Sequence, residues 1–344
     1  MNPLALMMSL ISLVIGTTIT MSSHHWLLAW IGLEVNTLAL LPLMTKTPHP
    51  RAIEAATKYF LTQATASALM LFSCLINALQ TGEWDINAPS NLMTNPLSIA
   101  LMMKLGLAPL HFWLPEVLQG ISLSTGLILS TWQKIPPMVL LIQMSDNTNL
   151  SLMITLGLAS ILIGGWGGMG QTQLRKIMAF SSIGHLGWVI LILKLNPQLS
   201  MFSFTLYIIM TTAMFASLIM ISTTKMSQIS ISWPKSPTLT TTAMIILLSL
   251  AGLPPLSGFS PKLLIILELV KQNMVILATL TMLASLLAMF FYLRLTYIIT
   301  LTLPPNIHNS TVIWRTPTKP HLMSAIMSTM ALALLPLTPA ILLM

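Results

Sequence analysis

The stretch on which the fold depends reads Lys104-Leu-Gly-Leu-Ala-Pro-Leu-His-Phe-Trp-Leu-Pro-Glu116. It lies inside an apolar segment, about residues 96–120, that is long enough to cross a bilayer. Pro109 and Pro115 donate no backbone hydrogen bond, so carbonyl groups one turn earlier lose their helical partners. Within a membrane such carbonyls need partners from protein or trapped water. A buried lysine beside a broken helix is typical of an ion path through a membrane transporter.

The same pattern occurs a second time, in Gly252-Leu-Pro-Pro-Leu-Ser-Gly-Phe-Ser-Pro-Lys262. This segment aligns without gaps on residues 106–116, with Gly, Leu, Pro, Leu and Pro in common and an aromatic residue at Trp113 and Phe259. Paired, proline-interrupted apolar segments indicate a transporter built from inverted structural repeats. We therefore predict an all-α polytopic membrane protein with two broken helices in inverted-repeat halves, about residues 1–145 and 146–344, of a single domain spanning residues 1–344.

The composition indicates a membrane protein. Of the 344 residues, 6% are charged and 55% are hydrophobic, and so few charges cannot cover a soluble domain. The formal net charge of +8 does not indicate nucleic acid, because the basic residues are scattered through short loops. The single cysteine, Cys74, excludes a disulfide framework and any cysteine-ligated metal or iron–sulfur site. The N-terminal residues resemble neither a signal peptide nor a transit peptide.

Hydropathy predicts eleven membrane spans. They cover approximately residues 3–21, 25–45, 54–79, 96–119, 122–143, 150–169, 178–195, 199–223, 239–269, 274–302 and 321–343. The ninth is too long for one straight helix, which fits a break near Gly252 to Gly258. The fifth holds Pro136 and Pro137 soon after Lys134 and is therefore expected to be kinked.

Lysine and arginine in the loops predict the orientation. Loops after odd-numbered spans carry Lys194 and Lys271 together with the acidic residues Glu83 and Asp85. Loops after even-numbered spans carry Lys46, Arg51, Arg175, Lys176, Lys225, Lys235, Arg315 and Lys319. We therefore expect the even-numbered loops and the N-terminus on the cytoplasmic or matrix side, and the C-terminus on the other side.

Five ionisable side chains are expected near the centre of the bilayer. Glu34, Lys134 and His185 fall near the middle of spans two, five and seven, while Lys104 and Lys262 flank the breaks in spans four and nine. A central charge costs about 2.5–3.5 kcal/mol even on a lenient scale, so these groups must be paired, hydrated or partly neutral. No acidic residue lies near Lys134 or Lys262 in sequence, which favours proton exchange over static pairing.

Structural roles stay open for several of these residues. Glu34 and Lys104 could form a static buried ion pair that clamps two helices. His185 could bond a neighbouring helix as readily as it could relay a proton. His111, which follows a proline break, could simply bond local groups. No His, Cys, Asp and Glu grouping in the sequence indicates a metal site.

Other suggestive strings favour structural readings. Glu54 and Lys58 form an i,i+4 pair at a helix start, and Glu116 is expected at the membrane interface. The string Gly165-Trp-Gly-Gly-Met-Gly170 matches G-x-G-x-x-G, but no strand precedes it. Close packing of helices through small residues is therefore preferred over a dinucleotide site.

Three strings carry a family resemblance: Pro109-Leu-His-Phe-Trp-Leu-Pro115, Arg175-Lys-Ile-Met-Ala-Phe-Ser-Ser-Ile-Gly-His185 and the segment from Gly252 to Lys262. Over its whole length the chain resembles the antiporter-like subunits of respiratory complex I, the proton-translocating NADH:ubiquinone oxidoreductase. Bacterial members of that family carry three further N-terminal helices. The 27 methionines and one cysteine resemble a mitochondrially encoded protein. The resemblance therefore implies the mitochondrial inner membrane, with the N-terminus in the matrix and the C-terminus in the intermembrane space.

The resemblance implies a proton-pumping subunit without a redox centre of its own. The family's glutamate, its three lysines and two histidines of its hydrophilic axis map to Glu34, Lys104, Lys134, Lys262, His111 and His185. NADH, FMN, iron–sulfur clusters and ubiquinone are implied on partner subunits, and the implied partners include other antiporter-like subunits and membrane lipid such as cardiolipin. The alternative is a free-standing cation/proton antiporter, and a passive membrane scaffold is a third reading.

Overall fold

The computed structural model describes residues 3–46, 48–86, 91–233, 236–301 and 322–338. In these ranges the regular structure is helical, apart from isolated bridges between His25 and Asp85 and between Gln173 and Lys225. The predicted all-α class is therefore confirmed. The chain divides into two compact units, Met1–Ser160 with Ile190–Pro197 and Ile161–Val189 with Gln198–Met344. The single domain with two halves stays a prediction.

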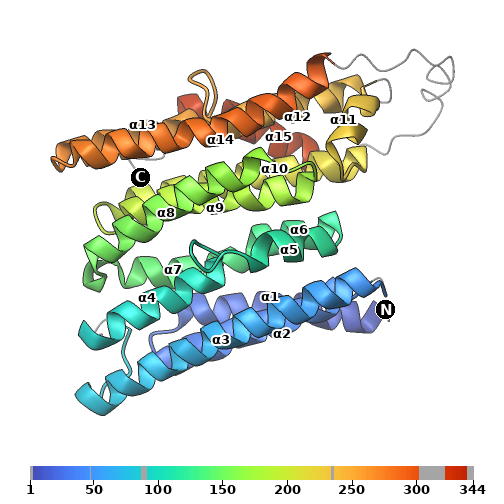
Figure 1. Cartoon of the computed structure of the whole chain (residues 1–344). Coiled ribbons are helices and arrows are strands. Elements are labelled where there is room, and N and C mark those ends of the chain that lie inside the picture. Colours follow the sequence, from blue (N-terminus) through green and yellow to red (C-terminus); the bar gives the residue numbers. More distant parts are fainter. Residues whose placement is uncertain (1–2, 47, 87–90, 234–235, 302–321, 339–344) are drawn as a thin grey trace. The chain divides into compact units, whose positions relative to one another are not determined.

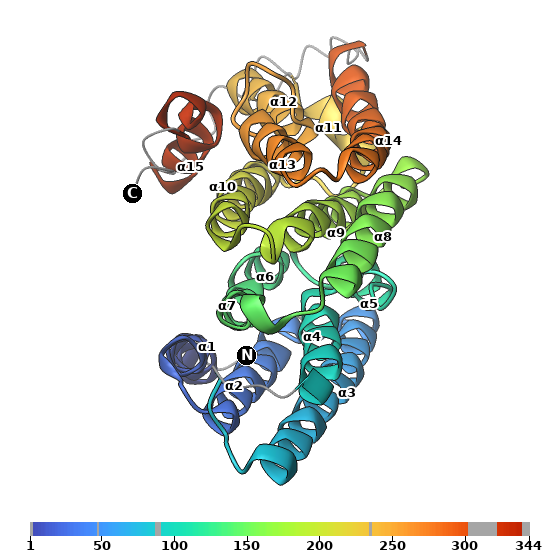
Figure 2. The ribbon, with the colours of Figure 1, turned by 90° about the vertical axis from the view of Figure 1, so that its left-hand side faces the viewer.

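Three long helices that lie side by side open the first unit (Figures 1 and 2). They are α1 (Pro3–Ser22), α2 (Trp26–Met44) and α3 (Pro50–Thr81). The α1 and α2 backbones approach closely, because a Cβ atom on Gly16 would lie 2.9 Å from the carbonyl oxygen of Gly32. Small residues that let two backbones meet are the usual packing device of membrane helices.

The first predicted break lies between α4 (Asn91–Leu105) and α5 (Trp113–Gly120). Gly106 ends α4 in the left-handed region, with a φ of 78°. Its amide donates to the Met103 carbonyl at 3.1 Å, and the Leu107 amide donates to the Met102 carbonyl at 3.1 Å. This pair of bonds is the Schellman pattern, which satisfies carbonyls that a broken helix would otherwise leave bare.

The second proline of this stretch does not break a helix, contrary to our expectation. Pro115 lies in the first turn of α5, where its missing N–H group has no helical acceptor to lose. The carbonyl group of His111 also keeps a partner, because it accepts from the Leu114 amide at 3.1 Å.

The fifth predicted span is interrupted, as expected from its prolines. It consists of α6 (Leu123–Ser130), the 3-10 turn η1 (Trp132–Lys134) and α7 (Ile135–Gln143). Pro136 and Pro137 occupy the first turn of α7, so the interruption lies just before them, at Lys134. The short turn η2 (Ser145–Asn147), the beginning of α8 (Leu150–Met169) and the segment Ile190–Pro197 complete this unit.

The second unit contains the second predicted break. It holds the end of α8 from Ile161 and most of α9 (Leu174–Leu193), up to Val189. Its other helices are α10 (Pro197–Ile221), α11 (Met226–Ser232), α12 (Pro237–Ala251), α13 (Phe259–Lys271), α14 (Val275–Leu301), α15 (Leu322–Ala333) and the turn η4 (Leu335–Leu337). Gly252 has a φ of 82°. The Gly252 amide donates to Ser249 at 2.9 Å and the Leu253 amide to Leu248 at 3.4 Å. The two aligned segments thus share one backbone geometry, and in both the next helix begins at the aligned aromatic residue.

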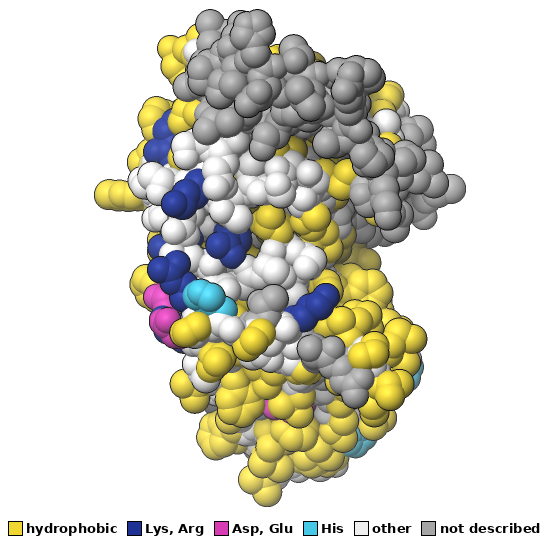
Figure 3. All heavy atoms as spheres, turned by 90° about the vertical axis from the view of Figure 1, so that its right-hand side faces the viewer, with side chains coloured by type: hydrophobic (Ala, Val, Ile, Leu, Met, Phe, Trp, Pro, Cys, Tyr) yellow, Lys and Arg dark blue, Asp and Glu magenta, His cyan; other side chains and the backbone are white. Residues whose placement is uncertain are grey.

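Seven helices of the described residues are long and apolar enough to cross a membrane: α1, α2, α3, α8, α9, α10 and α14. Their exposed faces are apolar, as Ile276 (79% exposed) and Leu283 (62%) of α14 illustrate. Figure 3 shows hydrophobic side chains over the lower part of one face, with several lysines and arginines gathered above them. The interrupted spans are pairs of shorter helices, so eleven crossings stay a prediction. The loop with Arg315 and Lys319 lies outside the described residues.

We expect Gly106→Ala to destabilise the break after α4. Alanine in the left-handed region costs about 1–2 kcal/mol, and its Cβ atom would lie 2.8 Å from Cδ1 of Leu114. Circular dichroism of the purified protein in detergent should show a lower unfolding temperature. Gly170→Ala is the matched control, because no atom lies within 4 Å of its added Cβ. Equal losses in both variants would contradict this account of the break.

Candidate functional site

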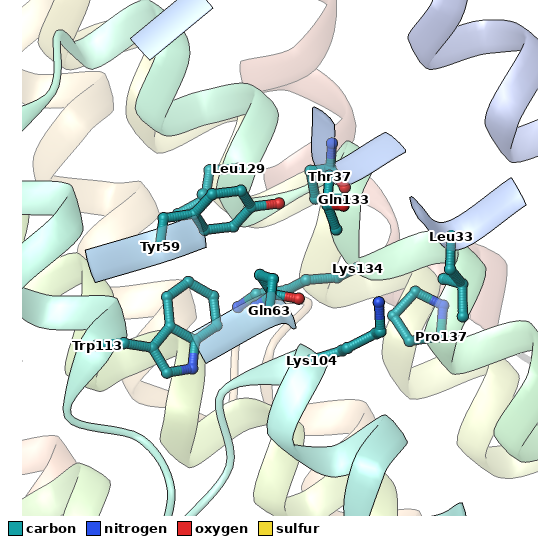
Figure 4. Close-up of a pocket in the computed structure, with 10 residues that line it drawn as sticks. All are labelled: Leu33, Thr37, Tyr59, Gln63, Lys104, Trp113, Leu129, Gln133, Lys134 and Pro137. Atoms are coloured by element: carbon teal, nitrogen blue, oxygen red, sulfur yellow. The ribbon is translucent and has the colours of Figure 1, made fainter. Parts of the chain in front are cut away.

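A small cavity in the first unit brings together two of the predicted lysines. Lys104 comes from the last turn of α4 and Lys134 ends η1, and both side chains are buried, with 6% and 3% exposed. The cavity measures about 20 Å³, which is enough for about one water molecule. Figure 4 shows the two lysines with the other lining residues, Leu33, Thr37, Tyr59, Gln63, Trp113, Leu129, Gln133 and Pro137.

Glu34 of α2 acts electrostatically on Lys104, but the two side chains form no ion pair within 4.0 Å. The buried atoms Oε2 of Glu34 and Nζ of Lys104 also have no hydrogen-bond partner in the described part of the chain. Unit charges 4 Å apart attract by about 4 kcal/mol at an effective dielectric constant of 20. Because that contact is not made, the structure does not show the static ion pair between Glu34 and Lys104 that the sequence allowed as an alternative.

Neutral polar groups hold the elements around this cavity. The Trp113 indole donates to the Met103 carbonyl at 3.3 Å, which joins α5 to the end of α4. The Gln133 amide donates to the Asn36 carbonyl at 2.9 Å, which joins η1 to the helix of Glu34. Gln63 adds a buried Nε2 atom without a partner among the described residues. Our sequence analysis missed the two glutamines because it considered only ionisable side chains near the centre of a span. An amide side chain inside an apolar helix also indicates a polar site.

His111 lies apart from this cavity, among local groups. Its side chain is 4% exposed, and its Nδ1 atom lies 3.2 Å from the carbonyl oxygen of Pro109. Its ring centroid lies 4.3 Å from that of Phe112. His111 is not among the residues that line the cavity of Lys104. Its geometry therefore fits the local alternative better than a contact with the lysines.

A second cavity of about 20 Å³, inside the second unit, brings together Lys262 and His185. The ammonium group of Lys262 donates to the Ala251 carbonyl at 2.7 Å. This carbonyl belongs to the last residue of α12, and the C-terminus of a helix attracts positive charge. The lysine side chain lies over Gly252, where a Cβ atom would come 2.7 Å from Nζ. Glycine is thus required at 252 both for its backbone angle and for the space that Lys262 fills.

Two buried tyrosines surround His185, and our sequence reasoning missed both. The hydroxyl oxygen of Tyr292 lies 3.4 Å from Nε2 of His185, and the ring of Tyr207 lies 6.0 Å from the imidazole. Each tyrosine is 1% exposed. The position of each tyrosine in the middle of an apolar span could have indicated that it belongs to a polar site.

Comparison with known proteins identifies the family. Residues 23–288 match the family described as NADH:quinone oxidoreductase/Mrp antiporter, TM, and residues 289–342 match NADH dehydrogenase subunit 2 C-terminus. The chain is 72% identical to NADH-ubiquinone oxidoreductase chain 2 of Aquarana catesbeiana over 344 residues, 100% of both chains. The chain belongs to the family of NADH-ubiquinone oxidoreductase chain 2. It is therefore a multi-pass membrane subunit of complex I, and the predicted family and enzyme are confirmed.

Further relatives agree with this membership in the chain 2 family. The Xenopus laevis protein of the same name is 58% identical over 345 residues, 98% of this chain and 99% of that one. A chain of respiratory complex I from Thermus thermophilus is 26% identical with a TM-score of 0.86, covering 98% of this chain and 79% of that chain. A chain of the Mrp complex from Dietzia sp. DQ12-45-1b is 21% identical with a TM-score of 0.80, covering 86% and 60%. The last similarity shows the shared fold alone.

In this chain 2 family member, the charged side chains of Lys58 and Arg294 make structural contacts outside the two lysine cavities. Lys58 bonds Glu54 at 2.6 Å, as predicted, and also Glu116 of α5 at 2.7 Å, which we did not predict. All three side chains are exposed, so the bonds add little stability. Arg294 of α14 donates to the carbonyl of Gln171 at 2.6 Å and to that of Met169, which ends α8. This arginine caps a helix end rather than lining either lysine cavity.

We expect Lys104→Met to raise the thermal stability of this chain 2 family member. Methionine fills similar space, and it removes a buried ammonium group that has no hydrogen-bond partner among the described residues. In known cases, replacing a whole buried ion pair by apolar residues gains up to about 1–4 kcal/mol, and Glu34 forms no ion pair with Lys104 whose loss would offset such a gain. Proteolysis of the assembled complex during heating should reveal a higher unfolding temperature for the variant subunit. Lys271→Met, at a side chain 74% exposed, should leave that temperature unchanged; a fall for Lys104→Met would show that its ammonium is well satisfied.

Proposed function

We propose that this subunit conducts protons across the mitochondrial inner membrane, driven by electron transfer from NADH to ubiquinone on other subunits of complex I. The observation that carries the proposal is the shared cavity of Lys104 and Lys134 at two interrupted helices. Burying two lysines in an apolar core, beside a water-sized space, lowers the stability of the fold. Proton exchange is the function that would explain why such an arrangement is kept.

Each predicted residue has a place in this proposal. A lysine, unlike an arginine, can lose its proton in a protein, and Lys104, Lys134 and Lys262 would each alternate between ammonium and amine. The negative charge of Glu34 would favour the ammonium form of Lys104 when the two side chains approach. Approach and separation of the two side chains would therefore let Lys104 take up and release a proton. His185 shares a cavity with Lys262 and is assigned to the relay there. His111 stays in the proposal as a relay candidate on resemblance alone.

The proposal assigns no redox centre to this chain. NADH, FMN, iron–sulfur clusters and ubiquinone would act on partner subunits, which we infer to include other antiporter-like subunits, with cardiolipin among the surrounding lipids. A free-standing cation/proton antiporter is less well supported, because the 72% identity to chain 2 covers the full length, whereas the Mrp similarity stands at 21%. A lone antiporter would move ions in liposomes without the other subunits, and a passive scaffold would tolerate neutral residues at the buried lysines.

We expect Lys262→Arg to lose coupled proton transport about as severely as Lys262→Met. Arginine keeps the positive charge but does not release its proton in proteins, so it preserves a structural contact to Ala251 and fails only as a relay. Proton uptake and NADH oxidation in assembled complex, each normalised to the amount of enzyme, measure the loss. Lys271→Arg on the same helix, at an exposed position, is the matched control. Normal transport with arginine and impaired transport with methionine would indicate a purely structural lysine.

We expect the loop between α10 and α11 to face the matrix and the loop between α13 and α14 to face the intermembrane space. Lys225 and Lys271, both exposed, lie in or beside these loops. Trypsin should cut after Lys225 only in inside-out inner-membrane vesicles and after Lys271 only in right-side-out vesicles, with the fragments identified by mass spectrometry. The reverse pattern would overturn the proposed orientation, and cleavage of both sites from one side would overturn the number of crossings between them.

A further inference from the structure

We propose that the hydroxyl group of Tyr292 relays protons between His185 and Lys262 in the second unit. The relay rests on the proposed function, because it has a purpose only if Lys262 carries protons. Neither the charge pattern of the sequence nor the family resemblance indicates this residue. Its placement depends on the fold, which brings α14 against α12 and α13 and sets the tyrosine beside the histidine of α9.

The contacts of Tyr292 point its hydroxyl at a proton donor. Its oxygen lies 3.4 Å from Nε2 of His185, the long end of hydrogen-bond distance, from which such contacts tighten during a reaction. Ser181, whose hydroxyl donates to the Met178 carbonyl at 2.8 Å, lines the same cavity one turn earlier on α9. The tyrosine hydroxyl thus lies beside His185 in a cavity that a second polar side chain of α9 also lines.

The second cavity connects this hydroxyl to the lysine. Ser181, His185, Lys262 and Tyr292 all line a space of about 20 Å³, which is enough for about one water molecule. Lys262 rests with its ammonium group on the Ala251 carbonyl at 2.7 Å, and its flexible side chain lies along the cavity wall over Gly252. One water molecule between the tyrosine oxygen and the lysine nitrogen would complete a chain of hydrogen bonds from His185.

A hydroxyl group suits this position because it both donates and accepts a hydrogen bond. In the proposed step, the imidazolium of His185 gives its Nε2 proton to the oxygen of Tyr292. The proton of that hydroxyl passes at the same time to the bridging water, and a water proton passes to the neutral amine of Lys262. The products are neutral imidazole, neutral tyrosine, water and a lysine ammonium, so one positive charge has moved from His185 to Lys262. Rotation of the O–H bond then resets the tyrosine.

Packing alone does not account for a tyrosine here. Phe291, the preceding residue, is 0% exposed, and its ring centroid lies 4.2 Å from that of Tyr292, so aromatic packing is already provided by phenylalanine. A phenylalanine at 292 would fill the same space and would avoid burying a hydroxyl group, which costs about 1–3 kcal/mol where it is poorly bonded. The oxygen atom is therefore the part of the side chain that needs a function.

The test is Tyr292→Phe in assembled complex I, which removes only that oxygen. Coupled proton transport per enzyme should fall at least about tenfold, since a positioned proton-transfer group contributes about 10²–10⁴-fold and water replaces part of it. Tyr297→Phe, the same change on the same helix at a side chain 66% exposed, should transport protons normally. Normal transport by Tyr292→Phe overturns the relay, and so does an equal loss in both variants.

Further variants test the relay if Tyr292→Phe alone does not decide it. If Tyr292→Phe does not assemble, Ser181→Ala tests the same cavity by removing a second hydroxyl from its wall. The relay then requires a loss of about threefold, the effect of one lost hydrogen bond to the bridging water, and unchanged transport overturns it. The double variant Tyr292→Phe with His185→Gln should be no worse than the poorer single variant, because both act in one path. Full transport by Lys262→Met would overturn the proposed function itself, whereas impaired Lys262→Met with normal Tyr292→Phe would overturn the relay alone.

Discussion

The polar groups at the two helix breaks must be satisfied inside an apolar environment, and the rest of the structure depends on how this is done. Water is not available in a bilayer core to bond the bare carbonyls of a broken helix. Both breaks solve the problem with a left-handed glycine and a Schellman pair. Side chains add to this: the Trp113 indole is a second donor to the Met103 carbonyl, and the Lys262 ammonium donates to the Ala251 carbonyl. A broken helix therefore creates both a polar site and the means to hold a charge there.

The two breaks share their backbone but not their charges. The position of Lys262 corresponds to Glu116 in the first segment, and Glu116 is exposed and bonded to Lys58 instead of lying against the break. The buried lysine of the first segment, Lys104, comes before its glycine rather than after it. The repeat is thus one of helix termination, which depends on glycine, proline and an aromatic residue. Each unit then places a lysine beside its break by a different route.

Sequence reasoning predicted the breaks well because their causes are local. Glycine and proline act on the neighbouring backbone, so Pro109, Gly252 and Pro136 indicate the interruptions without knowledge of the fold. The role of Gly106 in ending α4 was seen only in the structure. Pro115 was misread because the effect of a proline depends on where the next helix begins. The burial of the lysines followed from span depth, whereas the partners of those lysines did not. Gln63 and Tyr292 reach the cavities from helices distant in sequence from the lysines, and only the packing of the chain shows that.

The contrast between Arg294 and Lys104 separates a structural charge from a mobile one. The guanidinium of Arg294 donates to the carbonyls of Met169 and Gln171 and leaves only its Nε atom without a partner among the described residues. Its fixed fork and permanent charge suit a helix cap. Lys104 carries a compact ammonium group that has no hydrogen-bond partner among the described residues and faces a water-sized cavity. A group that is firmly bonded cannot change its charge without breaking those bonds, so proton carriers have to be incompletely satisfied in at least one state. The unsatisfied lysine is therefore the feature that a purely structural account of the fold leaves without a reason.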